Sequence, residues 1–239
     1  MLPRENGAQA SAGESHAIRR LKPALRLTLH SDFLPFYSFP RSMIRPVIAL
    51  LILTTASAVI PEYFAIGFTH ILPRGLDHIL FILGLFFLSK DFGTLLLQLT
   101  LFTLAHSLTL GLSLYGVVHA PTTVVEVAIA LSIAFVAGEN LLSDKLSRWR
   151  PWVVFGSGLI HGLGFAHSFE ETLVKPGDFL VALFSFNMGI ELGQLAVIGI
   201  ASAAVALWWK RNWYRTVIAR PASVVITSMG LYWTVERSL

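Results

Sequence analysis

The sequence contains no cysteine and very little charge. None of its 239 residues is cysteine, and Asp, Glu, Lys and Arg together make up 13% of the chain. Without cysteine there are no disulfide bonds, no thiolate metal site and no cysteine nucleophile, so any metal ion must be held by nitrogen and oxygen atoms. Because 54% of the residues are hydrophobic and the mean hydropathy is +0.67, an ordinary soluble globular domain is also excluded. The composition predicts an integral membrane protein.

The basic residues are not gathered into one patch but lie in short clusters between apolar runs. This placement is typical of the signals that orient membrane helices, so we expect the lipid bilayer, and no nucleic acid, as a partner. Each apolar run can cross about 30 Å of hydrocarbon as a helix. The sequence therefore predicts an all-α, polytopic membrane helix bundle in residues 61–239, with six core transmembrane helices near residues 71–89, 92–116, 124–142, 151–168, 179–208 and 219–236.

The N-terminal region has a different composition. Residues 1–42 are polar and basic, contain proline and serine, and show no apolar period, so they are predicted to be disordered. Residues 43–60 have a basic start, an apolar core and the small triplet Ala56-Ser57-Ala58. This layout fits a secretory signal peptide as well as a leading transmembrane helix. Both interpretations place the residues that follow outside the cytoplasm.

The loops between the apolar runs indicate the same orientation. By the positive-inside rule, the side with more Lys and Arg is cytoplasmic. The opposite side carries only Arg74, Lys175 and Arg237. We therefore expect a protein of the bacterial inner membrane, with both ends of the six-helix core outside the cytoplasm. The bases that mark the cytoplasmic side are Lys90, Lys145, Arg148, Arg150, Lys210, Arg211, Arg215 and Arg220.

Ionisable residues lie inside several of the predicted spans. From Ile79 to Leu88 there is only about 15 Å of helix, too little to cross the membrane, so the helix is expected to extend back through Asp77 and His78. The same count of about 1.5 Å per residue places histidines within the membrane on two other segments. These are His106, with Ser107 beside it, and His161.

A further polar face lies in "FNMGIELGQ". Asn187, Glu191 and Gln194 follow the i, i+4, i+7 spacing that puts side chains on one face of a helix. A charged residue at the centre of a membrane helix costs about 2.5–3.5 kcal/mol on insertion scales, so such residues normally face the bundle interior and one another. Imidazole and carboxylate groups suit Ni, Co or Zn. A metal or proton site is therefore predicted at Asp77, His78, His106, His161 and Glu191.

Simpler roles remain open for these residues. A membrane histidine beside serine or threonine is commonly hydrogen-bonded rather than bound to metal, and the Asn187 face also suits hydrogen bonds between helices. His70 and His167 fit interfacial positions, and Glu126 fits a charge at a helix N-terminus. The secondary site candidates are His70, Ser107, Glu126, His167 and Gln194.

Five blocks of sequence occur in one order from about residue 67 to the C-terminus: "GFTHILPRGLDHILFILGLFF", "FTLAHSLTL", "EVAIALSIAFVAGEN", "GLIHGLGFA" and "FNMGIELGQ". Together they resemble the HupE/UreJ family of hydrogenase and urease accessory membrane proteins, especially its second branch. The resemblance implies a small permease that carries nickel or cobalt, with metalloenzyme maturation proteins as partners. One departure is that nickel-cobalt permeases place four residues between a histidine and an Asp-His pair, whereas His70 precedes Asp77 by more. The resemblance implies transport-path roles for Asp77, His78, His106, His161, Asn187 and Glu191.

Three functions fit these residues. The main hypothesis is transport of a divalent transition-metal ion, most simply nickel or cobalt, through a His/Asp/Glu site in the outer half of the bundle. The alternative is an intramembrane zinc-dependent hydrolase that uses the same His/Asp cluster, with Ser107 nearby. The third is a membrane chaperone that holds metal without moving it. A transporter needs a path to the cytoplasm, which the mostly apolar inner halves of the helices leave unmarked.

Overall fold

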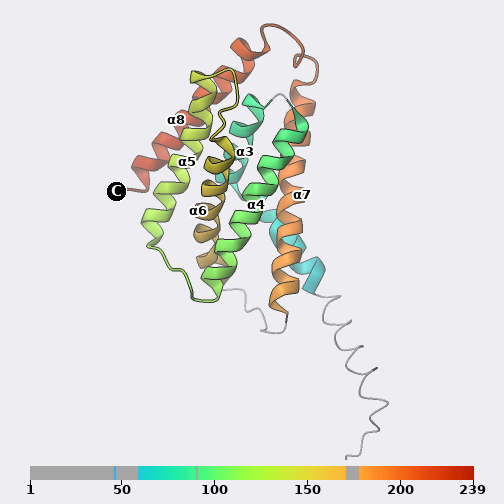
Figure 1. Cartoon of the computed structure of the whole chain (residues 1–239), viewed down its shortest axis with the longest axis vertical. Coiled ribbons are helices and arrows are strands. Elements are labelled where there is room, and N and C mark those ends of the chain that lie inside the picture. Colours follow the sequence, from blue (N-terminus) through green and yellow to red (C-terminus); the bar gives the residue numbers. More distant parts are fainter. Residues whose placement is uncertain (1–45, 47–58, 90, 171–177) are drawn as a thin grey trace, which may run out of the picture. The chain divides into compact units, whose positions relative to one another are not determined.

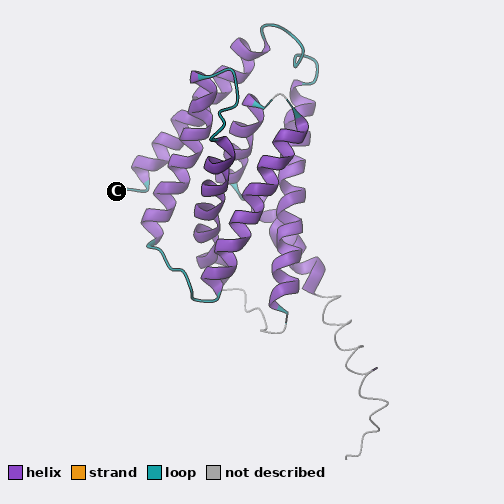
Figure 2. Cartoon of the chain, in the orientation of Figure 1, coloured by secondary structure: helices purple, strands orange, loops and turns teal. Residues whose placement is uncertain are grey.

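The computed structural model describes residues 46, 59–89, 91–170 and 178–239, and every regular element in these ranges is helical (Figures 1 and 2). The helices belong to one compact unit, Ile52–Leu239. The segment predicted to be disordered, residues 1–42, and nearly all of the signal peptide or leading helix, residues 43–60, lie outside the described residues. The prediction of an all-α protein is confirmed for the described part of the chain.

Five of the predicted spans agree with observed helices within a few residues. The first helix whose bounds the structure gives is Val59–Ile71. The elements that follow are α3 (Leu76–Leu88), α4 (Phe92–Leu114), α5 (Thr122–Leu142), α6 (Arg150–Glu170), α7 (Phe179–Val205), the short π-helix η1 (Arg215–Ala219) and α8 (Arg220–Glu236).

The first predicted span differs from the structure. A continuous helix over residues 71–89 was expected, but the chain turns at residues 72–75, and α3 is bent by 67° from the helix Val59–Ile71. Pro73 explains the interruption, because proline lacks the amide hydrogen and clashes with the preceding turn of a helix. The helix Val59–Ile71 and α3 thus form one broken span, and the helical half before the break was not predicted.

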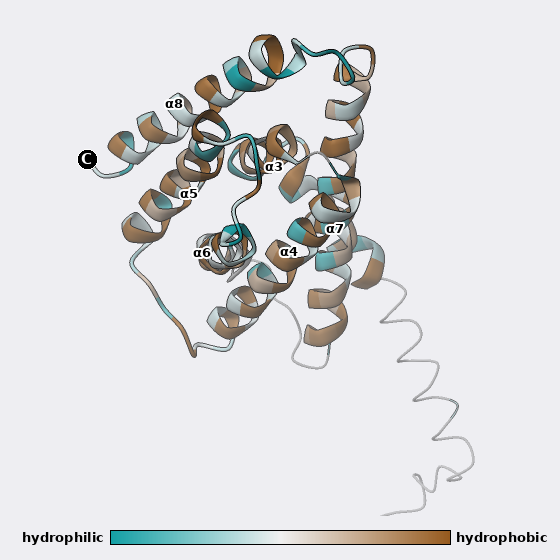
Figure 3. Ribbon diagram, turned by 45° about the horizontal axis from the view of Figure 1, so that its top comes forward, coloured by the Kyte–Doolittle hydropathy of each residue, from teal (hydrophilic) through white to brown (hydrophobic). Residues whose placement is uncertain are grey.

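The observed helices support fewer spans than six. Three of them, α4, α5 and α7, are long and apolar enough to cross a membrane, and the broken pair makes a fourth. Large apolar side chains on these three helices remain exposed, among them Leu104, Phe135 and Phe184, and hydrophobic residues cover much of their ribbons in Figure 3. Apolar surface of this extent suits contact with lipid. The protein is an integral membrane protein of three to four spans by this measure.

Helix α6 lies between α4 and α5 (Figures 1 and 3), and α8 packs along α5. Two glycines make the α4–α6 contact a close one. A Cβ atom at Gly158 would lie 2.5 Å from the carbonyl oxygen of Phe102, and one at Gly162 would lie 2.2 Å from that of His106. Small residues at this four-residue spacing let membrane helices approach closely. The contact therefore brings His161, next to Gly162, against α4.

The broken span crosses α7 in the same way. A Cβ atom at Gly67 would lie 2.0 Å from the carbonyl oxygen of Phe186, and one at Gly189 would lie 2.1 Å from that of Phe64. Gly193 of α7 adds a third close contact, since a Cβ atom there would lie 2.8 Å from Cβ of Ile71. Both helices therefore contribute glycines to the crossing. This reciprocal contact fixes the half-span that carries His70 against the bundle.

Stability should depend on the α4–α6 contact rather than on glycine content as such. Gly162→Ala should lower the free energy of unfolding by about 1–3 kcal/mol, because the added methyl group overpacks against backbone. Gly156→Ala, in the same helix with no atom within 4 Å of the added Cβ, is the matched control and should not destabilise. Thermal unfolding of the purified protein in detergent measures both; equal stability of the two variants would contradict the packing role.

Candidate metal site

The break in the first span places two histidines close together. His70 lies in the last turn of the helix Val59–Ile71, and His78 lies in the first turn of α3. At the turn, a Cβ atom on Gly75 would lie 2.2 Å from the carbonyl oxygen of His70, so only glycine fits there. Interrupted membrane helices are commonly the elements that build ion sites in transporters. The turn folds the two histidines toward one interior point.

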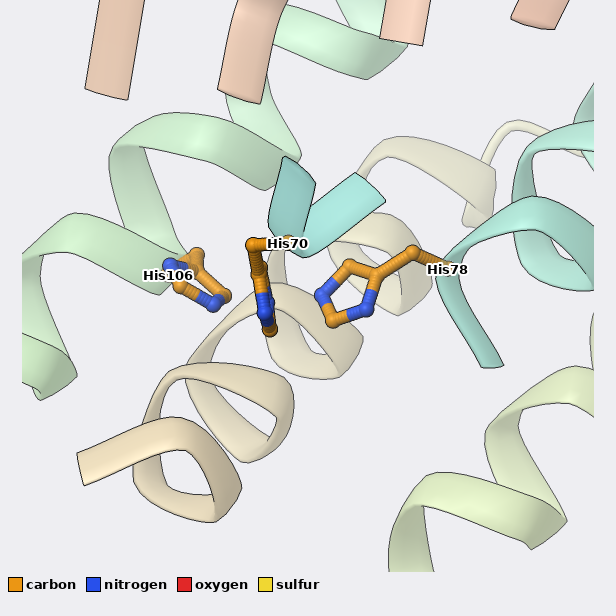
Figure 4. Close-up of side chains that lie close together, drawn as sticks. All are labelled: His70, His78 and His106. Carbon is orange, nitrogen blue, oxygen red and sulfur yellow. The ribbon is translucent and has the colours of Figure 1, made fainter. Parts of the chain in front are cut away.

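Four histidines from four helices meet at this point, and we call His70, His78, His106 and His161 the histidine cluster. One ring nitrogen from each of His70, His78 and His106 lies within 4.8 Å of the other two (Figure 4). The ring centroids of His70 and His78 are 4.6 Å apart, and those of His78 and His161 are 4.8 Å apart. Helices α4 and α6 supply His106 and His161.

Most nitrogens of the cluster have no hydrogen-bond partner among the described residues. The exposed fractions of His78, His106 and His161 are 6%, 0% and 1%. The buried nitrogens without a partner are Nε2 of His70, Nε2 of His78, both nitrogens of His106 and Nδ1 of His161. A buried polar group left without a partner costs about 1–3 kcal/mol. So many of them at one place indicate that a ligand or water completes the site.

The geometry fits a metal ion after a small adjustment. In imidazole sites the metal–nitrogen distance is about 2.0–2.1 Å, so tetrahedral ligand nitrogens are roughly 3.4 Å apart. The three nitrogens within 4.8 Å of one another would each have to move by roughly an ångström to reach this spacing. His161 is already oriented, since its Nε2 lies 3.1 Å from Oγ of Ser132. Imidazole nitrogen is a ligand for Zn, Cu, Fe and Ni.

An open cavity of about 540 Å³ leads to the cluster. We call it the histidine cavity. It is lined by the two halves of the broken span, the first turns of α5 and the later part of α6. His70, His78 and His161 line it together with Asp77 and Glu126. An ion therefore has access to the histidine nitrogens from this side.

On the opposite side of the cluster the bundle is filled. Phe81 lies one turn after His78 in α3, and Phe102 lies one turn before His106 in α4. Each is 1% exposed, and their ring centroids are 5.0 Å apart. Their rings lie 5.4 Å and 5.1 Å from that of His161. The two rings lie between the cluster and the end of α6 that begins at Arg150.

Beyond this aromatic pair is a buried polar network around Arg150. Its guanidinium forms an ion pair with Glu139 and donates to Oε1 of Gln98 at 3.3 Å and to the carbonyl oxygen of Gly84 at 3.2 Å. Arg150 is 1% exposed, so it is not the loop charge that the sequence suggested. Gln98 lies one turn before Phe102 in α4, and Gly84 lies one turn after Phe81 in α3. The path beyond the cluster is therefore closed by two layers.

The predicted carboxylate ligands lie away from the cluster nitrogens or are engaged elsewhere. Oδ1 of Asp77 accepts a hydrogen bond of 2.9 Å from Arg237, although Asp77 lines the cavity. Oε1 of Glu191 accepts from Oγ1 of Thr100 at 3.0 Å. Neither belongs to the group of three residues whose ligand atoms converge.

The remaining predicted residues have mainly structural contacts. Gln194 accepts from Thr103 at 3.1 Å, which joins α7 to α4 as interhelical hydrogen bonding predicts. Asn187 donates to the carbonyl oxygen of Leu183 at 2.8 Å, within its own helix. Ser107 likewise donates to Thr103 at 2.6 Å. His167 lies in α6, but its side chain is outside the described residues.

Two residues were underrated or missed. His70 was a secondary candidate, yet its ring is central to the cluster; the signal was its position on the other side of Pro73 and Gly75 from His78. Arg237 was interpreted only as an orientation charge, and it pairs with two acids at the histidine cavity. No sequence pattern connects Arg237 to Asp77, because 160 residues separate them.

Comparison with known families agrees with this architecture. The chain matches the model described as "HupE / UreJ protein" over residues 47–237. It belongs to the HupE/UreJ family. No curated protein and no solved structure gave a significant match. The matched range of this HupE/UreJ protein includes every histidine of the cluster and both layers beyond it.

Metal affinity of the HupE/UreJ protein should depend on the cluster. His70→Ala, His78→Ala and His106→Ala should each weaken Ni²⁺ or Co²⁺ binding by roughly tenfold or more, because each removes one ligand nitrogen. His119→Ala is the control, since His119 is an exposed histidine in the loop between α4 and α5 and does not belong to the cluster. Isothermal titration in detergent measures the affinities. Unchanged affinity in His70→Ala would exclude that residue from the site.

Proposed function

We propose that this HupE/UreJ protein transports a divalent transition-metal ion, nickel or cobalt, through the histidine cluster. One observation carries the proposal: four imidazoles from four helices, three buried and that of His70 partly buried, converge at the break of a membrane-spanning segment, with most of their nitrogens unpaired. The family assignment agrees with it. The ion is cargo in this proposal, and proteins that mature nickel enzymes would be its recipients.

The chemistry of the cluster suits an ion that binds and then leaves. Its ligands are neutral imidazoles, while the acids of the cavity are engaged with Arg237. Neutral ligands replace part of the water shell without cancelling the ion's charge, so binding is weaker than in a site with carboxylates or thiolates. Because imidazole must be unprotonated to bind, ions also compete with protons, and binding should weaken as the pH falls.

In this proposal, the structure represents one state of the transport cycle. The histidine cavity opens at one side of the cluster, and the aromatic pair and the Arg150 network close the other. By the positive-inside rule, the bases of the loops favour an orientation in which the closed side faces the cytoplasm. We propose that the ion enters from outside the bacterial inner membrane, in a bundle of six helices with α6 and α8 as the shorter or more polar members. Passage then requires the two closing layers to separate.

A zinc hydrolase is the second candidate, because three histidines beside an open cavity match the ligand set of catalytic zinc. Such an enzyme also needs a general base near the metal-bound water. Asp77 is the carboxylate nearest in sequence to a cluster histidine, and its hydrogen bond to Arg237 occupies it. The transport proposal needs no such base.

Proteoliposomes containing a Ni²⁺- or Co²⁺-quenched dye test the proposal. Wild-type protein should let the added ion reach the dye, and His78→Ala or His106→Ala should slow quenching by roughly tenfold or more. His119→Ala should behave like wild type. Binding without flux in the wild type would instead support a metal-holding chaperone. Tightly held zinc together with cleavage of a lipid or peptide substrate would support the hydrolase.

A further inference from the structure

Arg237 joins two acids from different helices at the edge of the histidine cavity. Its Nη2 lies 2.9 Å from Oδ1 of Asp77 in α3, and its Nη1 lies 3.1 Å from Oε2 of Glu126 in α5. Nη1 also donates to the carbonyl oxygen of Glu126 at 3.3 Å. The exposed side-chain fractions are 19% for Arg237, 29% for Asp77 and 40% for Glu126. The three groups are therefore within reach of water and ions.

Both acids line the cavity that contains unpaired histidine nitrogens. Nε2 of His78 and Nδ1 of His161 have no partner, and these two side chains are 6% and 1% exposed. Asp77 directly precedes His78 in the sequence, and both side chains line the same cavity, so an ion at the acids shares that cavity with the cluster. The acids are thus not an isolated surface feature but part of a cavity built for a ligand.

We infer that Asp77 and Glu126 form a divalent-cation site of their own, and that Arg237 is a tethered cation that occupies this site until an arriving ion displaces it. The inference rests on the proposed function only in taking the histidine cluster as the next site for the ion. Carboxylate oxygens are the preferred ligands of hard divalent cations such as Mn²⁺. The acids would therefore accept an ion that still keeps most of its water.

The observed contacts allow this exchange. Ion pairs with partly exposed members are weak because solvent screens them, so the arginine can leave without unfolding the protein. Arg237 follows the last residue of α8, and its guanidinium carbon is already 5.0 Å from the ring of Trp233. That ring provides a face on which a released guanidinium can stay. Arg74 also lines the cavity, but among the described residues it makes no ion pair with either acid.

The exchange would also make the site selective for charge. A monovalent cation offers the acids no more charge than Arg237, which is held beside them at high local concentration. A divalent ion offers twice that charge to the same two carboxylates. A divalent ion should therefore displace Arg237 from the two acids, whereas sodium and potassium should not.

The variants that test the exchange are Arg237→Gln and Arg237→Lys in the full-length protein in detergent, with Mn²⁺ binding followed by electron paramagnetic resonance. Arg237→Gln should bind Mn²⁺ roughly fivefold or more tightly than wild type, because it removes the competitor. Arg237→Lys keeps a competing cation and should stay near wild type. Adding Glu126→Gln to Arg237→Gln should abolish the gain. Arg220→Gln, which removes an ion pair from the start of the same helix, is the control and should have no effect.

A second measurement uses the wild-type protein and so does not depend on the stability of a variant. Arginine modification by phenylglyoxal, followed by peptide mass spectrometry, reports the accessibility of Arg237. Mn²⁺ should increase modification of Arg237 and leave Arg220 unchanged. Equal or slower modification of Arg237 with Mn²⁺, or unchanged or weaker Mn²⁺ binding by Arg237→Gln, would overturn the inference and leave Arg237 as a structural clamp.

The two proposals fail in different ways. If Arg237 does not respond to Mn²⁺ but His106→Ala still abolishes Ni²⁺ binding and flux, the exchange site is wrong and the transport function stands. If Mn²⁺ displaces Arg237 but Ni²⁺ binding and flux do not depend on the cluster, the exchange site stands and the transport function is wrong. His106→Ala itself should leave Mn²⁺ binding at the acids intact.

Discussion

A helix that breaks inside a membrane bundle must keep its backbone groups hydrogen-bonded, because lipid offers them no partners. The turn at residues 72–75 meets this demand locally. The amide of Leu72 donates to Phe68, that of Gly75 to Ile71 and that of Ile79 to Gly75. Pro73 has no amide hydrogen to satisfy. The break can therefore exist at this depth, and the positions of His70 and His78 relative to the other two cluster histidines depend on it.

The helices were predictable from the sequence because apolar runs are long and bounded by charges and prolines. The bounds of α4 and α7, for example, follow from hydropathy alone within a few residues. The break at residues 72–75 was harder to predict than the helices, because apolar residues continue through Ile71 and resume after His78. Proline and glycine at residues 73 and 75 were the available sign of it. The number of spans stays a prediction beyond the three or four that length and apolarity support.

The candidate site was predictable in its residue types but not in its grouping. His78, His106 and His161 stand out as ionisable residues in apolar segments, and the structure brings them together. Depth along each helix does not say which residues face one another, so Asp77 and Glu191 were grouped with them, whereas one pairs with Arg237 and the other with Thr100. Pairings between distant segments such as these are set by helix rotation and tilt, which a single sequence does not encode in its spacing.

The two layers that close the bundle beyond the histidine cluster affect whether the membrane can keep its ion gradients. A membrane that stores a proton and sodium gradient loses it through any continuous polar pore. Here the apolar rings of Phe81 and Phe102 and the buried ion pair of Arg150 with Glu139 fill the bundle on the side opposite the cavity, so the polar lining of the cavity is interrupted there. Under the proposed transport function, ions would cross only in discrete turnovers of the whole bundle, and a scarce metal could be gathered without short-circuiting the membrane potential.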